Sequence, residues 1–92
     1  MTHKFVWDSG MAYIRCVITP KVRITTKAWA GSTKPLWVDA VGFVKVNADC
    51  YEGHVYGTVS PAPPKRFANL GDAKAYVEEQ ALIGLAVNRL NV

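Results

Sequence analysis

Basic and aromatic side chains alternate along several strand-like stretches of this 92-residue chain. In an extended strand every second side chain points to the same face, so this alternation gathers cations and rings on one side of a sheet. Cations bind phosphates, and aromatic rings stack on bases or anchor a protein interface. The predicted binding surface consists of Arg15, Arg23, Lys27, Trp29, Trp37, Phe43, Lys45, His54 and Tyr56.

Two classes of macromolecule suit such a surface. Nucleic acid would use the cations for its phosphates, and a protein would use the rings as anchors. The net charge is only +4, from 11 Lys and Arg against 7 Asp and Glu, which is modest for a nucleic-acid binder. We therefore favour a host protein or nucleoprotein complex as the partner, with direct DNA or RNA binding as the alternative. A solvated face without a partner is the plainest interpretation.

Residue types that catalyse reactions or bind metals are present but lack the necessary spacing. His3, His54, Cys16 and Cys50 form no ligand motif. Glu52 and His54 are two residues apart on a strand, which makes them neighbours on one face. The chain has no glycine-rich phosphate loop and no nucleophile with a nearby base. We predict a protein that is not an enzyme, with no catalytic residue, no metal and no cofactor.

The segment 69–90 predicts the one long helix that must organise these strands. It contains no Pro and is rich in Ala, Leu and Glu. Asn69 suits the N-cap position, and Asp72 three residues later can complete a capping box. A period of 3.6 residues predicts a face that lies on the sheet, made of Ala73, Tyr76, Val77, Gln80, Ile83, Gly84 and Val87.

Two leucines fall outside that predicted face. Leu82 and Leu85 lie among the charged residues of the opposite side, where they would form an exposed apolar patch. Such a patch predicts a homodimer interface or a surface for another partner, and burial beneath an N-terminal strand or the chain terminus is the alternative. Both interpretations remain open from the sequence.

The segments before the helix predict strands joined by short turns. Pro20 is expected to break the chain between two of them, because proline lacks a ladder donor. Short connections favour antiparallel pairing between neighbours. The fold class is therefore α+β, a four- to five-stranded antiparallel meander with a C-terminal helix packed on one face. It forms a single domain of residues 1–92, with strands at 5–7, 11–18, 22–30, 36–46 and 50–60, a proline-rich connector at 61–66 and the helix at 69–90.

Small residues are expected where the helix meets the sheet. Glycine in a helix interior lowers the stability of the helix by about 1 kcal/mol relative to Ala, so we expect a packing reason for Gly84. Gly42, Gly53 and Gly57 fall on the inner side of the predicted strands, and together with Gly84 they would allow close approach. Cys16 lies on an apolar alternation and is expected in the core.

The run from Arg66 to Glu79, RFANLGDAKAYVEE, follows the predicted meander. It resembles the start of the helix in small accessory proteins of phages and mobile elements, a group that includes anti-CRISPR inhibitors. This resemblance implies an inhibitor of a host defence complex. The run also resembles the helix of AP2-type and integrase-arm DNA-binding domains, which implies DNA binding. Neither resemblance assigns functional residues.

The two cysteines are 34 residues apart and outside any CxxC motif, which favours a reducing compartment. The first residues contain no apolar run typical of a signal peptide, and no run approaches the length of a membrane span. We expect a cytoplasmic protein, in the host cytoplasm if a phage encodes it, that does not bind a membrane.

Overall fold

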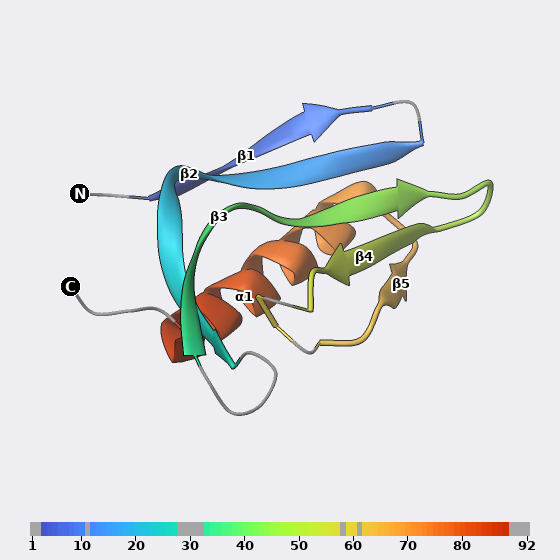
Figure 1. The fold of residues 1–92 in the computed structure, drawn as a ribbon. Helices are drawn as coiled ribbons and strands as arrows, with labels where there is room; N and C mark the ends of the chain where they lie inside the picture. Colours follow the sequence, from blue (N-terminus) through green and yellow to red (C-terminus); the bar gives the residue numbers. More distant parts are fainter. Residues whose placement is uncertain (1–2, 11, 28–32, 58, 61, 89–92) are drawn as a thin grey trace.

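In the computed structural model, an antiparallel sheet carries one C-terminal helix on one of its faces (Figure 1). The structure describes residues 3–10, 12–27, 33–57, 59–60 and 62–88, with the backbone alone at 23–27, 33–36 and 87–88. Within these residues the strands pair in sequence order, which confirms the predicted α+β meander. The elements are β1 (Lys4–Ser9), β2 (Tyr13–Lys27), β3 (Thr33–Val46), β4 (Tyr51–Val55), β5 (Lys65–Phe67) and α1 (Leu70–Asn88).

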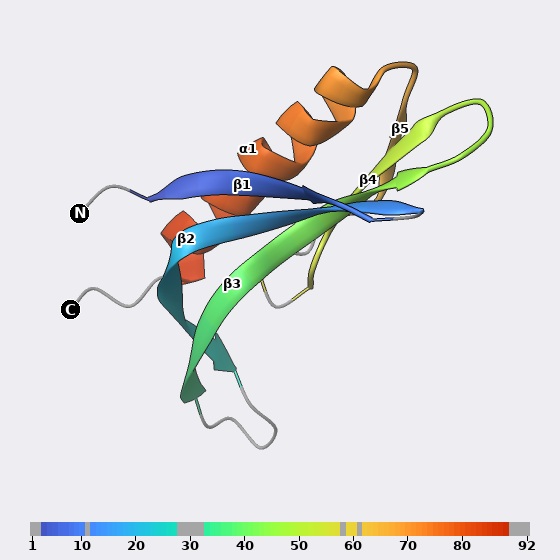
Figure 2. The same cartoon turned by 90° about the horizontal axis from the view of Figure 1, so that it is seen from above.

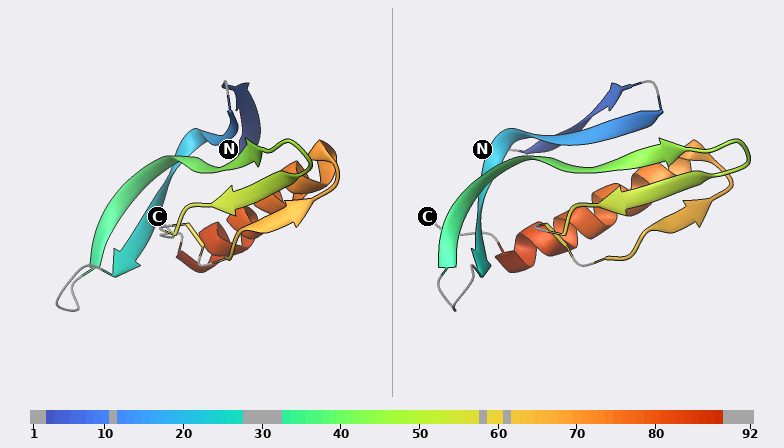
Figure 3. Two further views of the ribbon diagram at one scale, coloured as in Figure 1. Left: turned by 90° about the vertical axis from the view of Figure 1, so that its right-hand side faces the viewer. Right: turned by 45° about the vertical axis from the view of Figure 1, so that its right-hand side comes forward.

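The prediction that Pro20 ends a strand is wrong, because β2 continues from Tyr13 to Lys27. The pairing of β2 with β3 passes from Val17↔Ala40 to Val22↔Val38, so β2 has four intervening residues where β3 has one. Pro20, preceded by a cis peptide bond, lies among these extra residues, where its missing N–H interrupts no regular ladder. Extra residues bend a strand. The far part of β2 and β3 turns past the C-terminal end of α1 (Figures 2 and 3).

The last predicted strand is shorter than expected, and the connector contains a strand of its own. β4 ends at Val55, and the backbone then turns so that Val59 N and Ser60 N both donate to the carbonyl oxygen of Tyr56 at 2.9 and 3.0 Å. The proline-rich stretch predicted as connector, 61–66, ends in β5, which pairs with β4 through Glu52↔Arg66. The predicted residues 28–30 of the third strand and 89–90 of the helix lie outside the described residues.

The N-terminus of α1 is capped as the sequence predicts. Asp72 N donates to Asn69 Oδ1 at 2.8 Å, and Asn69 Nδ2 donates to Asp72 Oδ2 at 2.8 Å. The first bond satisfies one of the backbone donors that a helix leaves unpaired at its start. This local chemistry fixes where the helix begins.

Valine and small residues fill the layer between the helix and the sheet. Val41, Val44, Val59 and Val77 are fully buried there, as is the thiol of Cys16. Val41 occupies the point where the register moves from Cys16↔Gly42 to Val17↔Ala40, so it has no opposite residue on β2. A strict two-residue alternation along the predicted strand 36–46 would put Val41 on the same face as Phe43, and this irregularity explains why it belongs to the core instead.

Three of the four glycines expected at the helix contact are there. A Cβ at Gly42 would overlap the carbonyl oxygen of His54 and approach Val77, and one at Gly53 would meet Tyr76 at 3.0 Å. A Cβ at Gly84 would overlap the carbonyl oxygen of Val59, in the turn that follows β4. Gly57 is exposed, with open space around it, so its predicted place at the contact is wrong.

The helix turns a different face to the sheet from the one predicted. Ala73 and Val77 are fully buried as expected, but so is Ala81, and Leu85 is only 5% exposed. Ile83, which was expected against the sheet, is 51% exposed. The buried stripe includes Leu85, which lines a small cleft with Ile18 and Val22 of β2 beside the second half of the helix.

A polar contact joins the first strand to this helix. Trp7 Nε1 donates to Glu78 Oε2 at 3.0 Å, and Lys74 Nζ lies 5.4 Å from the centre of the Trp7 ring. These groups are 71 residues apart in the chain, so the contact ties the N-terminal edge of the sheet to the C-terminal helix.

Candidate functional site

The outer face of the sheet, opposite α1, carries two rows of side chains that run across neighbouring strands. The strand register places the members of each row directly opposite one another. The first row crosses four strands and consists of Asp8, Arg15, Phe43 and His54. The second crosses β2 to β5 and consists of Tyr13, Lys45, Glu52 and Arg66.

Aromatic rings gather around Phe43 at the centre of this face. The His54 ring stacks on Phe43 with 4.6 Å between ring centres and 6° between planes. Tyr13 meets Phe43 edge-on at 5.3 Å, and Tyr56 is tilted against it at 5.8 Å. With Arg15, three of these rings line a shallow hollow of about 370 Å³. We refer to Tyr13, Phe43, His54 and Tyr56 as the aromatic cluster.

The carboxylate of Glu52 anchors one side of the cluster. Asn47 Nδ2 donates to Glu52 Oε2 at 2.6 Å, and His54 Nε2 lies 3.1 Å from Glu52 Oε1. Arg66 Nε is 3.8 Å from Oε2. The Asn47 bond, then the His54 bond and the Arg66 charge, hold the pKa of Glu52 below its ordinary value, although desolvation opposes the shift. Glu52 therefore fixes the His54 ring on Phe43.

Acidic groups accompany most of the cations on this part of the face. Arg15 Nη2 lies 3.5 Å from Asp8 Oδ2, and both side chains are largely exposed. Arg66 approaches Glu52. Lys45 is exposed beside the cluster, opposite Glu52 in the register. The surface around the rings thus carries charges of both signs.

The structure separates the predicted surface into two parts. Arg15, Phe43, Lys45, His54 and Tyr56 come together at the aromatic cluster. Trp37, 64% exposed, lies six residues from Phe43 along β3, which places it roughly 20 Å away at strand spacing. Arg23 pairs with Trp37 in the register and Lys27 ends β2, but their side chains are not described, and Trp29 lies outside the described residues.

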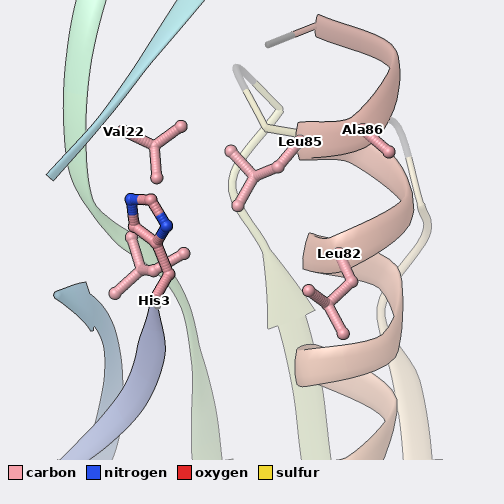
Figure 4. Close-up of a pocket in the computed structure, with 6 residues that line it drawn as sticks. His3, Val22, Leu82, Leu85 and Ala86 are labelled. Carbon is pink, nitrogen blue, oxygen red and sulfur yellow. The ribbon is translucent and has the colours of Figure 1, made fainter. Parts of the chain in front are cut away.

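The two leucines predicted as a dimer interface have different environments. Leu82 is 57% exposed, whereas Leu85 is buried, so the placement of Leu85 on an outer patch is wrong. Figure 4 shows both leucines directed from α1 toward Val22 and His3 across a small apolar cleft of about 160 Å³. Leu85 was misplaced because the bend in β2 brings Ile18 and Val22 beside it. A homodimer through this side of the helix stays a prediction.

The two cysteine thiols are free and differ in their burial. Cys16 is fully buried, and burial, with the nearby charge of Glu78, raises the pKa of its thiol to about 12. A thiol with such a pKa carries no thiolate near neutral pH, so Cys16 acts as a small core residue. Asn47 Nδ2 donates a hydrogen bond to Cys50 Sγ at 3.6 Å. In the described residues no three His, Cys, Asp or Glu side chains gather as a metal site.

Sequence reasoning missed four members of the outer surface. Tyr13 shares a face of its strand with Arg15 by alternation, but its contact with Phe43 depends on the register between β2 and β3. Asp8 and Arg66 were missed because each pairs with a group on another strand, and Arg66 lies in a strand that was taken for a connector. Glu52 was recognised as a neighbour of His54 on one face, but it was not assigned to the surface. The available sequence signal was the two-residue alternation, which places Tyr13 on the same face as Arg15 and Glu52 on the same face as His54.

Comparison with known proteins gives no relative. No protein-family model, no curated protein and no solved structure matches this chain. Among the described residues, no helix combines the length and apolar character needed to cross a membrane.

Proposed function

We propose that this chain is a non-enzymatic binding protein that occupies the surface of a partner protein or nucleoprotein complex with the outer face of its sheet. The observation that carries the proposal is the aromatic cluster, with rings from β2, β3 and the β4 region held against Phe43. Aromatic residues and arginine are enriched at the centres of protein interfaces. Rings fixed by their neighbours lose little rotamer entropy on binding.

The charge pattern favours a protein over a nucleic acid. Arg15 lies beside Asp8, and Glu52 lies beside both His54 and Arg66. A phosphate backbone is bound through a surplus of cations, because release of counterions drives the association. Acidic groups among the rings weaken that attraction, whereas paired charges of both signs suit the polar rim of a protein interface.

The partner class follows from the resemblance stated above. Anti-CRISPR inhibitors and related phage proteins act on a host defence complex, and a chain of that kind would use the aromatic cluster as its contact. This role rests on the resemblance and on the exposed cluster together.

Direct binding of single-stranded DNA or RNA is the second candidate. It is supported by the tyrosine rings, since Tyr13 is 50% exposed and Tyr56 38%, next to the cations Arg15 and Lys45. Exposed rings on the face of a sheet can stack bases, at about 1–3 kcal/mol per base.

A comparison of tagged variants tests the first proposal. The native chain and the Tyr13→Ala/Tyr56→Ala variant are used to capture complexes from cells that naturally contain the protein. We expect the variant to lose the partner, while Ile83→Ala, an exposed substitution on α1, retains it. Retention by the tyrosine variant, or loss only with Ile83→Ala, contradicts binding through the outer face.

Fluorescence anisotropy with labelled single-stranded oligonucleotides tests the second candidate. Binding through the outer face predicts an affinity that falls steeply with salt and is lost on Arg15→Glu. Absence of a complex at low salt removes nucleic acid from consideration and leaves the protein partner as the proposal.

A further inference from the structure

The two edges of the sheet differ in how they are protected from pairing with another strand. At one edge, β5 has three residues and follows Pro63 and Pro64, which cannot donate to a ladder. At the other edge, β1 has six residues, Lys4–Ser9, with no proline and a regular register against β2. In the described residues β1 has a neighbouring strand on one side only (Figure 1).

The side chains of β1 alternate strictly between the two faces. Phe5 and Trp7 are half-buried and pack against the core. Lys4, Val6 and Asp8 are exposed on the outer face, with Val6 at 42%. An exposed valine between a cation and an anion is suited to pairing with a strand that carries the same residues in reverse order.

The sequence of β1 is complementary to itself in the antiparallel direction. If two copies pair with Val6 opposite Val6, Lys4 of each copy faces Asp8 of the other. Phe5 of each copy then faces Trp7 of the other on the inner face. Opposite charges and aromatic pairs directly across two strands stabilise a sheet. A shift of one residue would place Val6 of one copy opposite Phe5 or Trp7 of the other, which would turn the inner faces of the two copies to opposite sides of the sheet, so the register is specific.

We propose that β1 is the interface of a symmetric homodimer, in which two copies pair antiparallel about Val6 and form one continuous sheet. The twofold relation closes the assembly, because among the described residues each copy presents β1 as the long edge strand without a second neighbour. Asp8 Oδ2 lies near Arg15, and a carboxylate can accept from Lys4 of the second copy at the same time.

This dimer stands independently of the function proposed for the outer face, and it has a consequence for it. Antiparallel strands in one sheet direct opposite residues to the same side. The aromatic clusters of the two copies therefore lie on the same side of the continuous sheet, and a partner with two sites would bind both at once. The short interface implies a dimer of modest affinity, with a dissociation constant in roughly the micromolar range.

Charge reversal tests both the interface and its register. Sedimentation equilibrium of the full chain, from about 5 to 500 µM, should show a monomer–dimer equilibrium. Lys4→Glu places acids opposite each other at two points, and Asp8→Lys places cations there, so each variant alone should dimerise at least about tenfold more weakly. An equimolar mixture of the two variants restores both opposite-charge pairs and should form a heterodimer as tight as the native dimer.

Cysteine cross-linking provides a second measurement. In a Cys50→Ser background, Val6→Cys should form a disulfide-linked dimer under mild oxidation, because the two positions face each other. Val46→Cys, an equally exposed valine on β3, should remain monomeric. Circular dichroism of each variant confirms that it is folded.

Either of two results overturns the proposal. A native chain that remains monomeric over the whole concentration range has no such interface. A dimer whose affinity is unchanged by Lys4→Glu and Asp8→Lys, and which Val6→Cys does not trap, forms through another surface, such as the side of α1 that carries Leu82.

Discussion

The two faces of the same strands, β3 and β4, are built in opposite ways. On the inner face, Gly42 and Gly53 bring the backbone against Val77 and Tyr76, with no room for a further methyl group. On the outer face, Phe43 and His54, each next to one of those glycines, hold a stacked pair of rings at the surface. The glycines let α1 lie close to the sheet, and the adjacent residues project away from it.

This contrast indicates which substitutions should affect stability and which should affect binding. The inner face is closely packed, so small changes in side-chain volume there should change the free energy of unfolding. The outer face is held by ring contacts and by hydrogen bonds to Glu52, and its tyrosines can be changed with little effect on folding.

The strongest test compares two glycines of α1. Gly84→Ala should lower the free energy of unfolding by about 2–3 kcal/mol, because its Cβ overlaps the Val59 carbonyl and lies 2.8 Å from Ser60 Cβ. Gly71→Ala should raise it by about 0.5–1 kcal/mol, because the nearest group is 3.6 Å away and Ala favours a helix. Urea unfolding measures both. Equal effects would show that the contact with Val59 is loose.

A pair of valines on β3 should show the next largest difference. Val41→Ala removes methyl groups from a fully buried site and should cost about 2 kcal/mol, since the surrounding core only partly closes the cavity. Val46→Ala, at an exposed site on the same strand, should cost less than about 0.5 kcal/mol. Thermal unfolding in parallel gives the comparison, and a small effect at Val41 would place it on the solvent side.

The contact between β1 and α1 should contribute less to the free energy of unfolding than the buried side chain of Val41 does. Trp7→Phe removes the hydrogen bond to the Glu78 carboxylate and should cost about 1–1.5 kcal/mol. In a Glu78→Ala background the same substitution should cost less, because the acceptor is already gone. A double-mutant cycle with no coupling energy would mean that the bond adds nothing to stability.

The smallest expected effect is the pH dependence from Glu52. Its pKa is lower in the folded chain than in the unfolded one, so its stabilisation is present above the unfolded value, near 4.3, and is lost as pH falls through the folded value. Between about pH 5 and pH 3 the melting temperature of the native chain should fall more than that of Glu52→Gln. Parallel slopes for the two proteins would contradict the Asn47 and His54 contacts.

Much of the fold followed from local patterns in the sequence. The N-cap at Asn69, the meander order and the inward side of Cys16 depend on short-range chemistry or on a period of two, and all were predicted. The predictions failed where distant parts of the chain decide. The extra residues around Pro20 bend β2 toward Leu85, and the irregular register buries Val41. No periodicity within one segment contains that information.

The candidate site was predictable in its composition but not in its extent. The two-residue alternation within each strand was enough to place Arg15, Phe43 and His54 on the outer face of the sheet. Alternation alone could not show that these residues form a cluster far from Trp37. That separation depends on the pairing between strands and on the length of β3. The acidic residues that balance the cations were missed for the same reason.

The small cleft beside α1 shows that the two ends of the described chain lie close together, because His3 and Ala86 both line it (Figure 4). A short linker between the two described ends would therefore leave the strands and the helix in place, and the chain could be opened instead at the turn of residues 47–50. The strands would keep their places in the sheet while their order along the chain became β4, β5, α1, β1, β2, β3. Such a circular permutant would carry both of its ends at the tip of the β3–β4 hairpin.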